Sequence, residues 1–433
     1  MSSKEWLETT LGELITFQRG HDLTVQNSSY GKYPVVGSNG IIAYHNEFTT
    51  QAPCLTVGRS GNSAGTPHFY DKDCWAHNTT LYVKKFHTVD PKFIYYYLKT
   101  LDLKQFASGS AVPTLNRNHI HPIKVRVPRN IKEQRRIACV LSSLDDKIEL
   151  NNAINKNLDE MAQALFKRWF VDFEFPNDNG EPYKSSGGEF EESELGLIPN
   201  GWKIGNFQDL ITDTLGGDWG KETPQGNYTQ EVSCIRGADI PEIATGSMGK
   251  VPQRFTLLKN AAKKSLSHGD IIIEISGGSP TQSTGRTAFI IDEVLNKFSS
   301  PLICTNFCRV IKPISDYAEY LYCHLIYLYN EDIFFQYENG TTGIKNLDIG
   351  SLFSVHKIAI PTQPVLLQFA SHYLKMYSMI QHLGRETDQL AQIRDTLLPK
   401  LMSGDIRVPV DQESILATRR QMVAEESEPY NAT

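Results

Sequence analysis

The residues of this sequence that could do chemistry are polar side chains in glycine-rich segments rather than a catalytic cluster. The sequence has no GxxxxGKS or GxxxxGKT phosphate loop, no HExxH zinc motif and no Asn-Pro-Pro-aromatic motif of amino-methyltransferases. Residues 58–65 contain three glycines without the GxGxxG spacing of a dinucleotide loop. Loops of this kind can approach a DNA groove closely. The sequence therefore favours recognition over turnover.

Arginine can bridge the two acceptors of guanine, and asparagine or glutamine can bridge adenine. On this basis we predict base contacts from loop residues in both halves of the chain, namely Arg19, Ser38, Asn39, Arg59, Asn62, His77, Asn78, Arg236, Gln282, Thr284 and Arg286. For each residue, the alternative is that it caps a turn or lies in solvent.

The net charge of −6 is unusual for a DNA-binding chain, but the acidity is segregated. Residues 174–194 hold seven acids against the single base Lys184, and the tail from Asp411 is also acidic. A basic stretch at residues 117–136 remains. We predict phosphate contacts from its cations: Arg117, Lys124, Arg126, Arg129, Lys132, Arg135 and Arg136.

The seven cysteines are odd in number and form no CxxC pair, so we expect reduced thiols and no metal site. No apolar run reaches the length needed to span a bilayer, and the first residues do not resemble a signal peptide. We therefore expect a cytoplasmic protein.

These segments occur twice along the chain, in the same order. Residues 57–66 are matched by 275–285, and residues 106–120 by 337–352. In each half an alternating strand then ends in a proline, Pro128 or Pro361, before a long helix. The sequence thus predicts a duplicated αβ domain.

The two long helices have apolar residues at heptad spacing, and residues 158–170 align with 390–402 without a gap. We predict that they pair as a coiled coil, with the seam Leu144, Ile148, Asn151, Asn155, Leu158, Leu165, Ile380, Leu383, Leu390 and Leu397. The alternative is that each helix packs on its own domain.

The predicted fold class is α+β, with two duplicated αβ domains joined by two long coiled-coil helices. The predicted order is a first recognition domain, the central helix, an acidic glycine-rich linker that could form a short hairpin, a second recognition domain, the C-terminal helix and a tail. The corresponding boundaries are 1–129, 130–172, 173–200, 201–362, 363–405 and 406–433.

Several of these segments resemble the specificity subunit of Type I restriction-modification enzymes. They are KYPVVGSNGIIAYHNEF (residues 32–48), LTVGRSGNSAGT (55–66), ASGSAVPTLNRNHI (107–120) and VPRNIKEQRRI (127–137). The resemblance covers nearly the whole chain. The second half departs from it at IPTQPVLLQFA (360–370), where an acidic residue before the glutamine is usual.

The resemblance implies a non-catalytic DNA-binding subunit with two duplicated αβ target-recognition domains joined by two long antiparallel coiled-coil helices, in which each domain reads one half of a bipartite site. The helices would set the spacer and dock two modification (methyltransferase) subunits, and restriction (ATP-dependent endonuclease and translocase) subunits would join for cleavage. The methyl donor, ATP and magnesium would bind these partners and not this chain. Because the loops of the two halves differ, we expect an asymmetric site in double-stranded DNA. The alternatives are a stand-alone DNA-modifying enzyme and a non-catalytic protein-binding scaffold.

Overall fold

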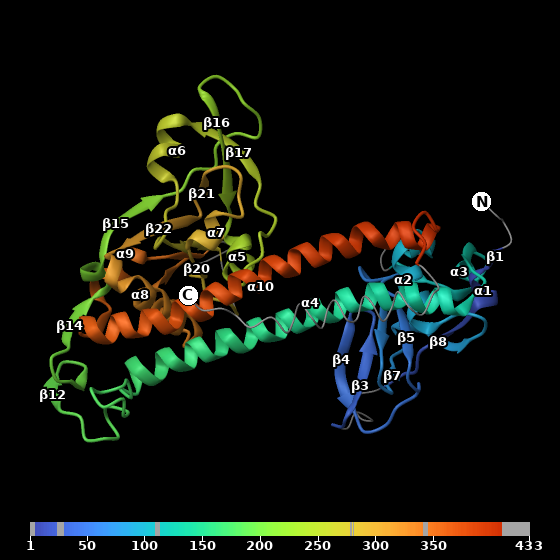
Figure 1. Cartoon of the computed structure of the whole chain (residues 1–433), viewed down its shortest axis with the longest axis horizontal. Coiled ribbons are helices and arrows are strands. Elements are labelled where there is room, and N and C mark those ends of the chain that lie inside the picture. Colours follow the sequence, from blue (N-terminus) through green and yellow to red (C-terminus); the bar gives the residue numbers. More distant parts are fainter. Residues whose placement is uncertain are drawn as a thin grey trace. The chain divides into compact units, whose positions relative to one another are not determined.

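The computed structural model describes residues 5–23, 30–108, 113–277, 279, 281–340 and 345–408. It contains two compact units, unit 1 (Met1–Asp146 and Ala391–Thr433) and unit 2 (Lys147–Leu390). The division cuts both long helices, α4 (Ile131–Phe166) and α10 (Gln363–Ser403), so each unit contains parts of both (Figure 1). α4 and α10 begin at Ile131 and Gln363, close to the predicted starts at residues 130 and 363. The boundaries predicted for the other domains stay predictions.

The described part of unit 1 consists of small sheets with short helices between them. Its sheets have the strand orders β1-β11, β2-β8-β5-β6, β4-β3-β7 and β10-β9. The strands are β1 (Trp6–Thr10), β2 (Ile15–Arg19), β3 (Tyr33–Gly37), β4 (Gly40–His45), β5 (Cys54–Gly58), β6 (Pro67–Tyr70), β7 (Trp75–Ala76), β8 (Thr80–Phe86), β9 (Ala107–Ser108), β10 (Thr114–Leu115) and β11 (Lys124–Pro128). The helices are α1 (Leu11–Leu14), α2 (Pro91–Thr100), η2 (Leu103–Phe106) and α3 (Arg117–Ile120).

The described part of unit 2 repeats this plan with longer loops. Its sheets have the orders β14-β25, β15-β22-β18-β20, β17-β16-β21 and β19-β24-β23, besides the hairpin β12-β13. The strands are β12 (Phe190–Ser193), β13 (Gly196–Pro199), β14 (Lys203–Asn206), β15 (Ile211–Gly216), β16 (Tyr228–Ile235), β17 (Gln253–Leu257), β18 (Ile271–Glu274), β19 (Ser276–Gly277), β20 (Thr287–Phe289), β21 (Leu302–Cys304), β22 (Cys308–Pro313), β23 (Glu338–Asn339), β24 (Lys345–Leu347) and β25 (Lys357–Ile360). The helices are η3 (Lys167–Val171), η4 (Phe207–Leu210), η5 (Gly237–Asp239), α5 (Ile240–Ala244), α6 (Leu258–Lys264), α7 (Asp292–Leu295), η6 (Ser315–Tyr317), α8 (Ala318–Asn330), η7 (Ile333–Tyr337) and α9 (Ile349–Val355).

The strand pairing supports the predicted duplication. The central strand β3 pairs antiparallel with β4 and parallel with β7, and β16 pairs in the same two ways with β17 and β21. In each unit, the strand before a long helix pairs antiparallel with the first strand of the domain, as β1–β11 and β14–β25. Equivalent strands can therefore be compared residue by residue.

Local sequence explains why both halves fold alike. A capping box follows each first strand: the Thr10 amide donates to Glu13 at 2.9 Å, and the Asn206 amide donates to Asp209 at 2.9 Å. After the next strand, a Cβ on Gly20 or on Gly217 would lie 2.1 Å from a backbone oxygen, that of His77 or Thr305. Only glycine fits there, because a side chain would displace the facing backbone.

Each core is completed by ends of both long helices. In unit 1, Ile137 and Leu141 of α4 and Leu401 and Met402 of α10 lie in the core of the first domain. In unit 2, Ala162 and Phe166 of α4 and Phe369, Tyr373 and Tyr377 of α10 lie in the core of the second domain. Both long helices therefore pack on the domains, as the alternative to a coiled coil predicts.

The helices also contact each other in antiparallel order within each unit. In unit 1, Arg394 donates to Asp145 at 2.7 Å. In unit 2, Asn151 donates to Glu386 at 2.7 Å, Asn155 donates to the carbonyl of Ile380 at 3.3 Å, and the rings of Phe166 and Phe369 are 6.2 Å apart. All ten predicted seam residues are buried or half-buried, as a seam requires.

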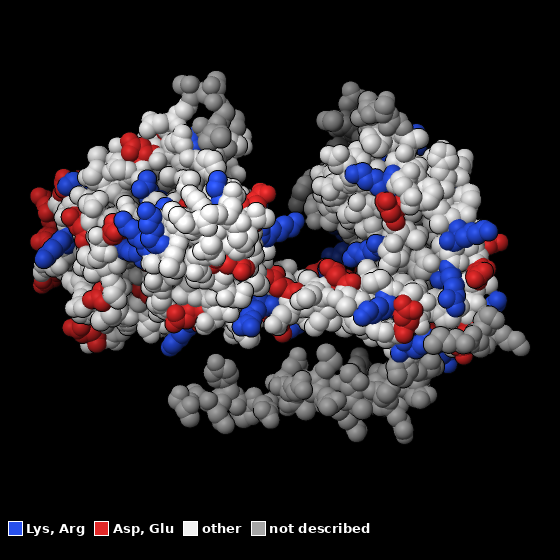
Figure 2. Space-filling view, turned by 90° about the horizontal axis from the view of Figure 1, so that it is seen from above, with Lys and Arg blue, Asp and Glu red and all other residues white. Residues whose placement is uncertain are grey.

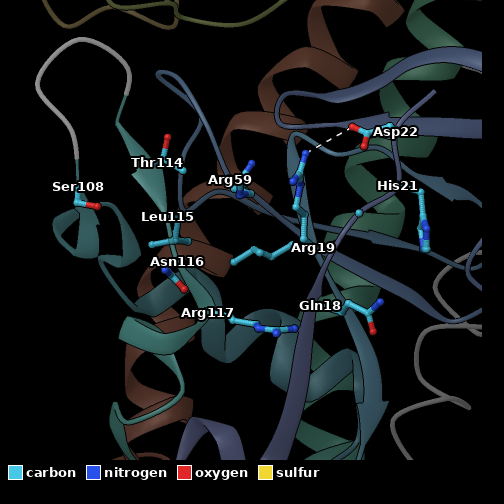
Figure 3. A pocket seen from close by; sticks show the side chains of 12 residues that line it. Gln18, Arg19, His21, Asp22, Arg59, Ser108, Thr114, Leu115, Asn116 and Arg117 are labelled. Atoms are coloured by element: carbon cyan, nitrogen blue, oxygen red, sulfur yellow. Dashed lines mark hydrogen bonds and ion pairs between the residues drawn. The ribbon is translucent and has the colours of Figure 1, made fainter. Parts of the chain in front are cut away.

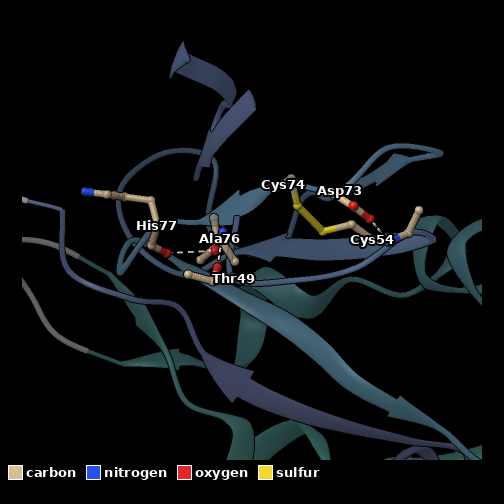
Figure 4. Close-up of a disulfide and its surroundings, with 8 residues drawn as sticks. Thr49, Cys54, Asp73, Cys74, Ala76 and His77 are labelled. Atoms are coloured by element: carbon tan, nitrogen blue, oxygen red, sulfur yellow. Dashed lines mark hydrogen bonds between the residues drawn. A yellow bond between two sulfur atoms is a disulfide. The ribbon is translucent and has the colours of Figure 1, made fainter. Parts of the chain in front are cut away.

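The cysteines differ from the sequence expectation, and the linker forms a hairpin that is packed into a core. Cys54 and Cys74 form a disulfide beside β5 and β7, which corrects the expectation that all thiols are reduced (Figure 4). The expected linker contains the antiparallel hairpin β12-β13, whose Ile198 lies with Phe175 and Trp202 in the core of unit 2. Aromatic and aliphatic side chains therefore anchor a segment whose composition is mostly polar. The predicted tail from residue 409 onward lies outside the described residues.

Candidate nucleic-acid interface

Three arginines from distant parts of the sequence line one open cavity of about 790 Å³ in unit 1 (Figure 3). Arg19 ends β2, Arg59 follows β5, and Arg117 begins α3. Strand pairing explains their convergence, because β2 and β5 both pair with β8, and the amide of Leu115 donates to the carbonyl of Arg59 at 2.7 Å. The structure thus groups two predicted base contacts with one predicted phosphate contact.

The arginines of this cavity keep most of their hydrogen-bonding capacity. Arg19 lies 3.4 Å from Asp22, Arg59 donates to the carbonyl of Asn78 at 3.4 Å, and Arg117 donates to the carbonyl of Phe17 at 3.5 Å. A guanidinium has five N–H donors, so these long contacts orient the groups and leave donors for a ligand. The Asp22 carboxylate also accepts from the side-chain amide of Asn78. Asp22 is the acidic residue among the described residues that line this cavity. The cavity is therefore suited to phosphate oxygens or guanine acceptors.

The other predicted base contacts of unit 1 form a loop cluster, in which the loops after β3, β5 and β7 meet. The Ser38 hydroxyl accepts from the Ser60 amide at 3.2 Å, and the Ser63 hydroxyl donates to Asn39 at 3.0 Å. His77 Nδ1 lies 3.0 Å from the Thr79 hydroxyl. Ser38 and His77 are thus partly occupied in joining the loops.

Exposure and charge distinguish the members of this cluster. Burial lowers the pKa of His77, which favours its neutral form. Asn39 is exposed, as is Asn62 in the loop after β5. These two asparagines are therefore the cluster residues freest to meet a ligand.

In unit 2, Arg236 and Arg286 line a second cavity, of about 660 Å³. Arg236 makes two 2.8 Å hydrogen bonds to Asp239, and Arg286 donates to Glu274 at 2.8 and 2.6 Å. Gln282 is exposed and donates to Tyr329 at 3.2 Å.

Thr284 is fully buried, and its amide donates to Glu338. Its assignment as a base contact is therefore corrected, because the side chain is enclosed by the protein.

The remaining predicted phosphate contacts follow β11 and the start of α4. Lys124 and Arg126 alternate with buried residues on the exposed face of β11, and Arg126 stacks on Trp6 at 5.3 Å. Arg129 and Lys132 are exposed, Arg135 lies 3.4 Å from Asp90, and Arg136 is half-buried. On the face seen in Figure 2, Lys and Arg are interspersed with Asp and Glu.

Register equivalence identifies residues that the sequence analysis missed. Arg19 pairs with Leu81 across β2 and β8, and Gly216 pairs with Arg309 across β15 and β22. Arg309 therefore occupies in unit 2 the place of Leu81, which lines the unit 1 cavity. Among the described residues, its buried Nε atom has no hydrogen-bond partner. Aligning the strands of the two halves residue by residue could have identified Arg309, whereas the composition of the loops could not.

One segment of unit 1 has the spacing of a catalytic serine motif. Residues 61–65 read GNSAG, which fits the GxSxG spacing of a nucleophilic serine. In that motif the serine lies between a strand and a helix, whereas Ser63 lies between the antiparallel strands β5 and β6. In the described ranges, no cluster of His, Cys, Asp and Glu could hold a metal ion, and no helix is both long and apolar enough to cross a membrane.

Comparison with known proteins supports the family indicated by the sequence. Residues 3–160 match the model of the Type I restriction modification DNA specificity domain. The chain is 28% identical to the Type I restriction enzyme MjaIX specificity subunit of Methanocaldococcus jannaschii, over 73% of this chain and 69% of that protein. It is 22% identical to the HindI specificity subunit of Haemophilus influenzae, over 73% of this chain and 77% of that protein.

A solved structure shares the fold. The crystal structure of the S subunit of a Type I restriction-modification system from M. genitalium aligns with a TM-score of 0.62 at 16% identity, covering 93% of this chain and 97% of that one. This likeness shows that the chain shares the fold, while residues 3–160 match the DNA specificity domain of Type I restriction-modification systems and the chain is similar in sequence to their specificity subunits.

Proposed function

We propose that each unit reads one half of an asymmetric bipartite site in double-stranded DNA. The observation that carries the proposal is that equivalent loops of the two units differ in side chains. By strand register, Thr79 of unit 1 corresponds to Phe307 of unit 2, and Arg59 corresponds to Ile275. Equivalent scaffolds with different loop chemistry suit two different half-sites.

Within unit 1, we assign Arg19 and Arg59 to base edges and Arg117 to the phosphate backbone. The assignment is supported by their grouping in one cavity with free guanidinium donors. Asn39 and Asn62, both exposed, are further base contacts in this assignment. Lys124, Arg126 and Arg129 would hold the domain on the backbone without reading sequence.

We further propose that α4 and α10 set the separation of the half-sites and dock two methyltransferase subunits. Each helix contributes to both cores, so helix length is the natural determinant of spacing. Restriction subunits would join the complex for cleavage. The chain itself would be non-catalytic, and its partners would bind the methyl donor, ATP and magnesium, as the family resemblance implies.

Single-molecule mapping of methylated bases tests the proposal in a host that expresses this chain with its modification subunits. We expect one bipartite motif with two different halves, and exchange of residues 1–129 for another recognition domain should alter one half only. A changed second half after that exchange would contradict the proposal. Methyl transfer or DNA cleavage by the purified chain alone would instead favour a stand-alone enzyme.

A further inference from the structure

Two aromatic residues line the cavity of unit 2, whereas the described residues that line the unit 1 cavity include no Phe, Tyr or Trp. Phe307 is 57% exposed and Trp219 is 37% exposed, and both line the cavity. The guanidinium of Arg254 stacks on Trp219 at 4.0 Å from the ring centroid. Large exposed aromatic side chains contribute little to a folded core, and such rings commonly mark binding sites.

The charged groups in this cavity are paired. Arg236 and Arg286 each make bidentate hydrogen bonds, to Asp239 and Glu274, whose side chains are only 3% and 4% exposed. Two cations and two anions leave the local charge near zero. An anionic phosphate gains little from such a site, whereas a neutral, planar group with hydrogen-bonding edges is suited to it.

The backbone holds Phe307 in place. Its carbonyl accepts from the Ile275 amide at 2.8 Å and from the Ser276 amide at 3.3 Å, which joins the β21–β22 loop to the end of β18. The equivalent residue in unit 1, Thr79, accepts in the same way from the Arg59 amide at 2.8 Å. The two loops thus share a backbone arrangement, but unit 2 presents an apolar ring where unit 1 has a hydroxyl.

We propose that Phe307 stacks on a nucleobase of the second half-site, in the cavity that Trp219 and the Arg286–Glu274 pair also line. The inference rests on the proposed function, since it requires that unit 2 faces DNA. A stacked base has to leave the regular stack of its duplex, at least at one step, so unit 2 would read a locally distorted half-site. The arginine and glutamate supply a donor and an acceptor for the edge of that base.

The test uses the complex of this chain with its modification subunits and a duplex carrying the mapped site. Adenines or cytosines of the second half-site, except the methylated base, are replaced singly by 2-aminopurine or pyrrolocytosine. We expect fluorescence at one position to rise on binding of the wild-type complex and to stay low with Phe307→Ala. Affinity of Phe307→Ala for the site should fall roughly 5- to 160-fold, the range for loss of one stacked base. Phe307→Trp should restore both signals.

The matched control is Leu258→Ala, which removes another exposed apolar side chain of unit 2, 68% exposed. It should leave affinity and fluorescence unchanged, and thermal melting should show that Phe307→Ala is folded. If the wild-type complex selects the mapped site, but Phe307→Ala binds it within twofold and no analogue responds, the stacking proposal is overturned while the proposed function stands. If the wild-type complex does not prefer the mapped site to a scrambled duplex, both are overturned.

Discussion

Replacing Leu401 by alanine should destabilise unit 1, although Leu401 is almost 400 residues from the start of that unit. Leu401 of α10 is 2% exposed and lies in the unit 1 core with Ile137 and Leu141. Truncation of a buried leucine costs about 2–5 kcal/mol, through lost apolar burial and the cavity that remains. The size of the loss within this range depends on how far Met402 and Leu397 can move into the space.

Native-state hydrogen exchange measures this loss in each unit separately. If exchange in the sheet β2-β8-β5-β6 requires opening of unit 1, Leu401→Ala should accelerate it by roughly 30- to 5000-fold. Exchange in the sheet β15-β22-β18-β20 of unit 2 should be unchanged. The control Ile393→Ala alters an exposed residue of the same helix, 47% exposed, and should change stability by about 0.5 kcal/mol or less. Acceleration confined to unit 2, or none in unit 1, would refute the reasoning.

Three further predictions concern acid stability, salt dependence and spacing. Burial lowers the pKa of His324 to about 3, below its unfolded value, so only the unfolded chain takes up this proton as pH falls below about 6.5. Unit 2 should lose roughly 2 kcal/mol between pH 7 and 5 in denaturant titrations, and His324→Gln should lose less. Arg117→Gln should weaken binding to specific and random DNA alike and reduce the slope of log affinity against log salt by about one. Deleting one heptad from α4 and one from α10 should shorten the spacer by about 3 base pairs.

Each of these three has an outcome that would contradict it. An unchanged acid profile in His324→Gln would show that other groups control the acid response. Loss of sequence preference without a change in salt slope would place Arg117 on a base rather than on a phosphate. Altered half-sites with an unchanged spacer, seen by methylation mapping, would refute the role assigned to the helices.

The features predicted correctly from sequence are those set by local pattern. Heptad spacing located both long helices, and the prolines Pro128 and Pro361 marked the strand ends before them. The duplication could be recognised because turns, caps and helices repeat in order. Such signals come from neighbouring residues, so they are visible without knowledge of tertiary pairing.

The errors and omissions depend on long-range pairing. Thr284 is a residue type expected of a loop contact, but it is buried and its amide donates to Glu338, more than fifty residues away. Arg309 and Phe307 become candidates only when the register of β22 against β15 and β18 is known. The cysteine pair Cys54–Cys74 likewise depends on how β5 and β7 are brought together. Loop composition alone does not specify these neighbours.

The sharing of helix ends between cores has a consequence for protein synthesis. The first domain leaves the ribosome well before α10 is made, but its core includes Leu401 and Met402 of that helix. Until α10 emerges, apolar surface on β-sheets and on α4 remains open to water, and the contacts that close it have very large sequence separation. The domain that is translated first should therefore be completed only after the second domain has been made, and during that interval chaperones have the greatest opportunity to bind it.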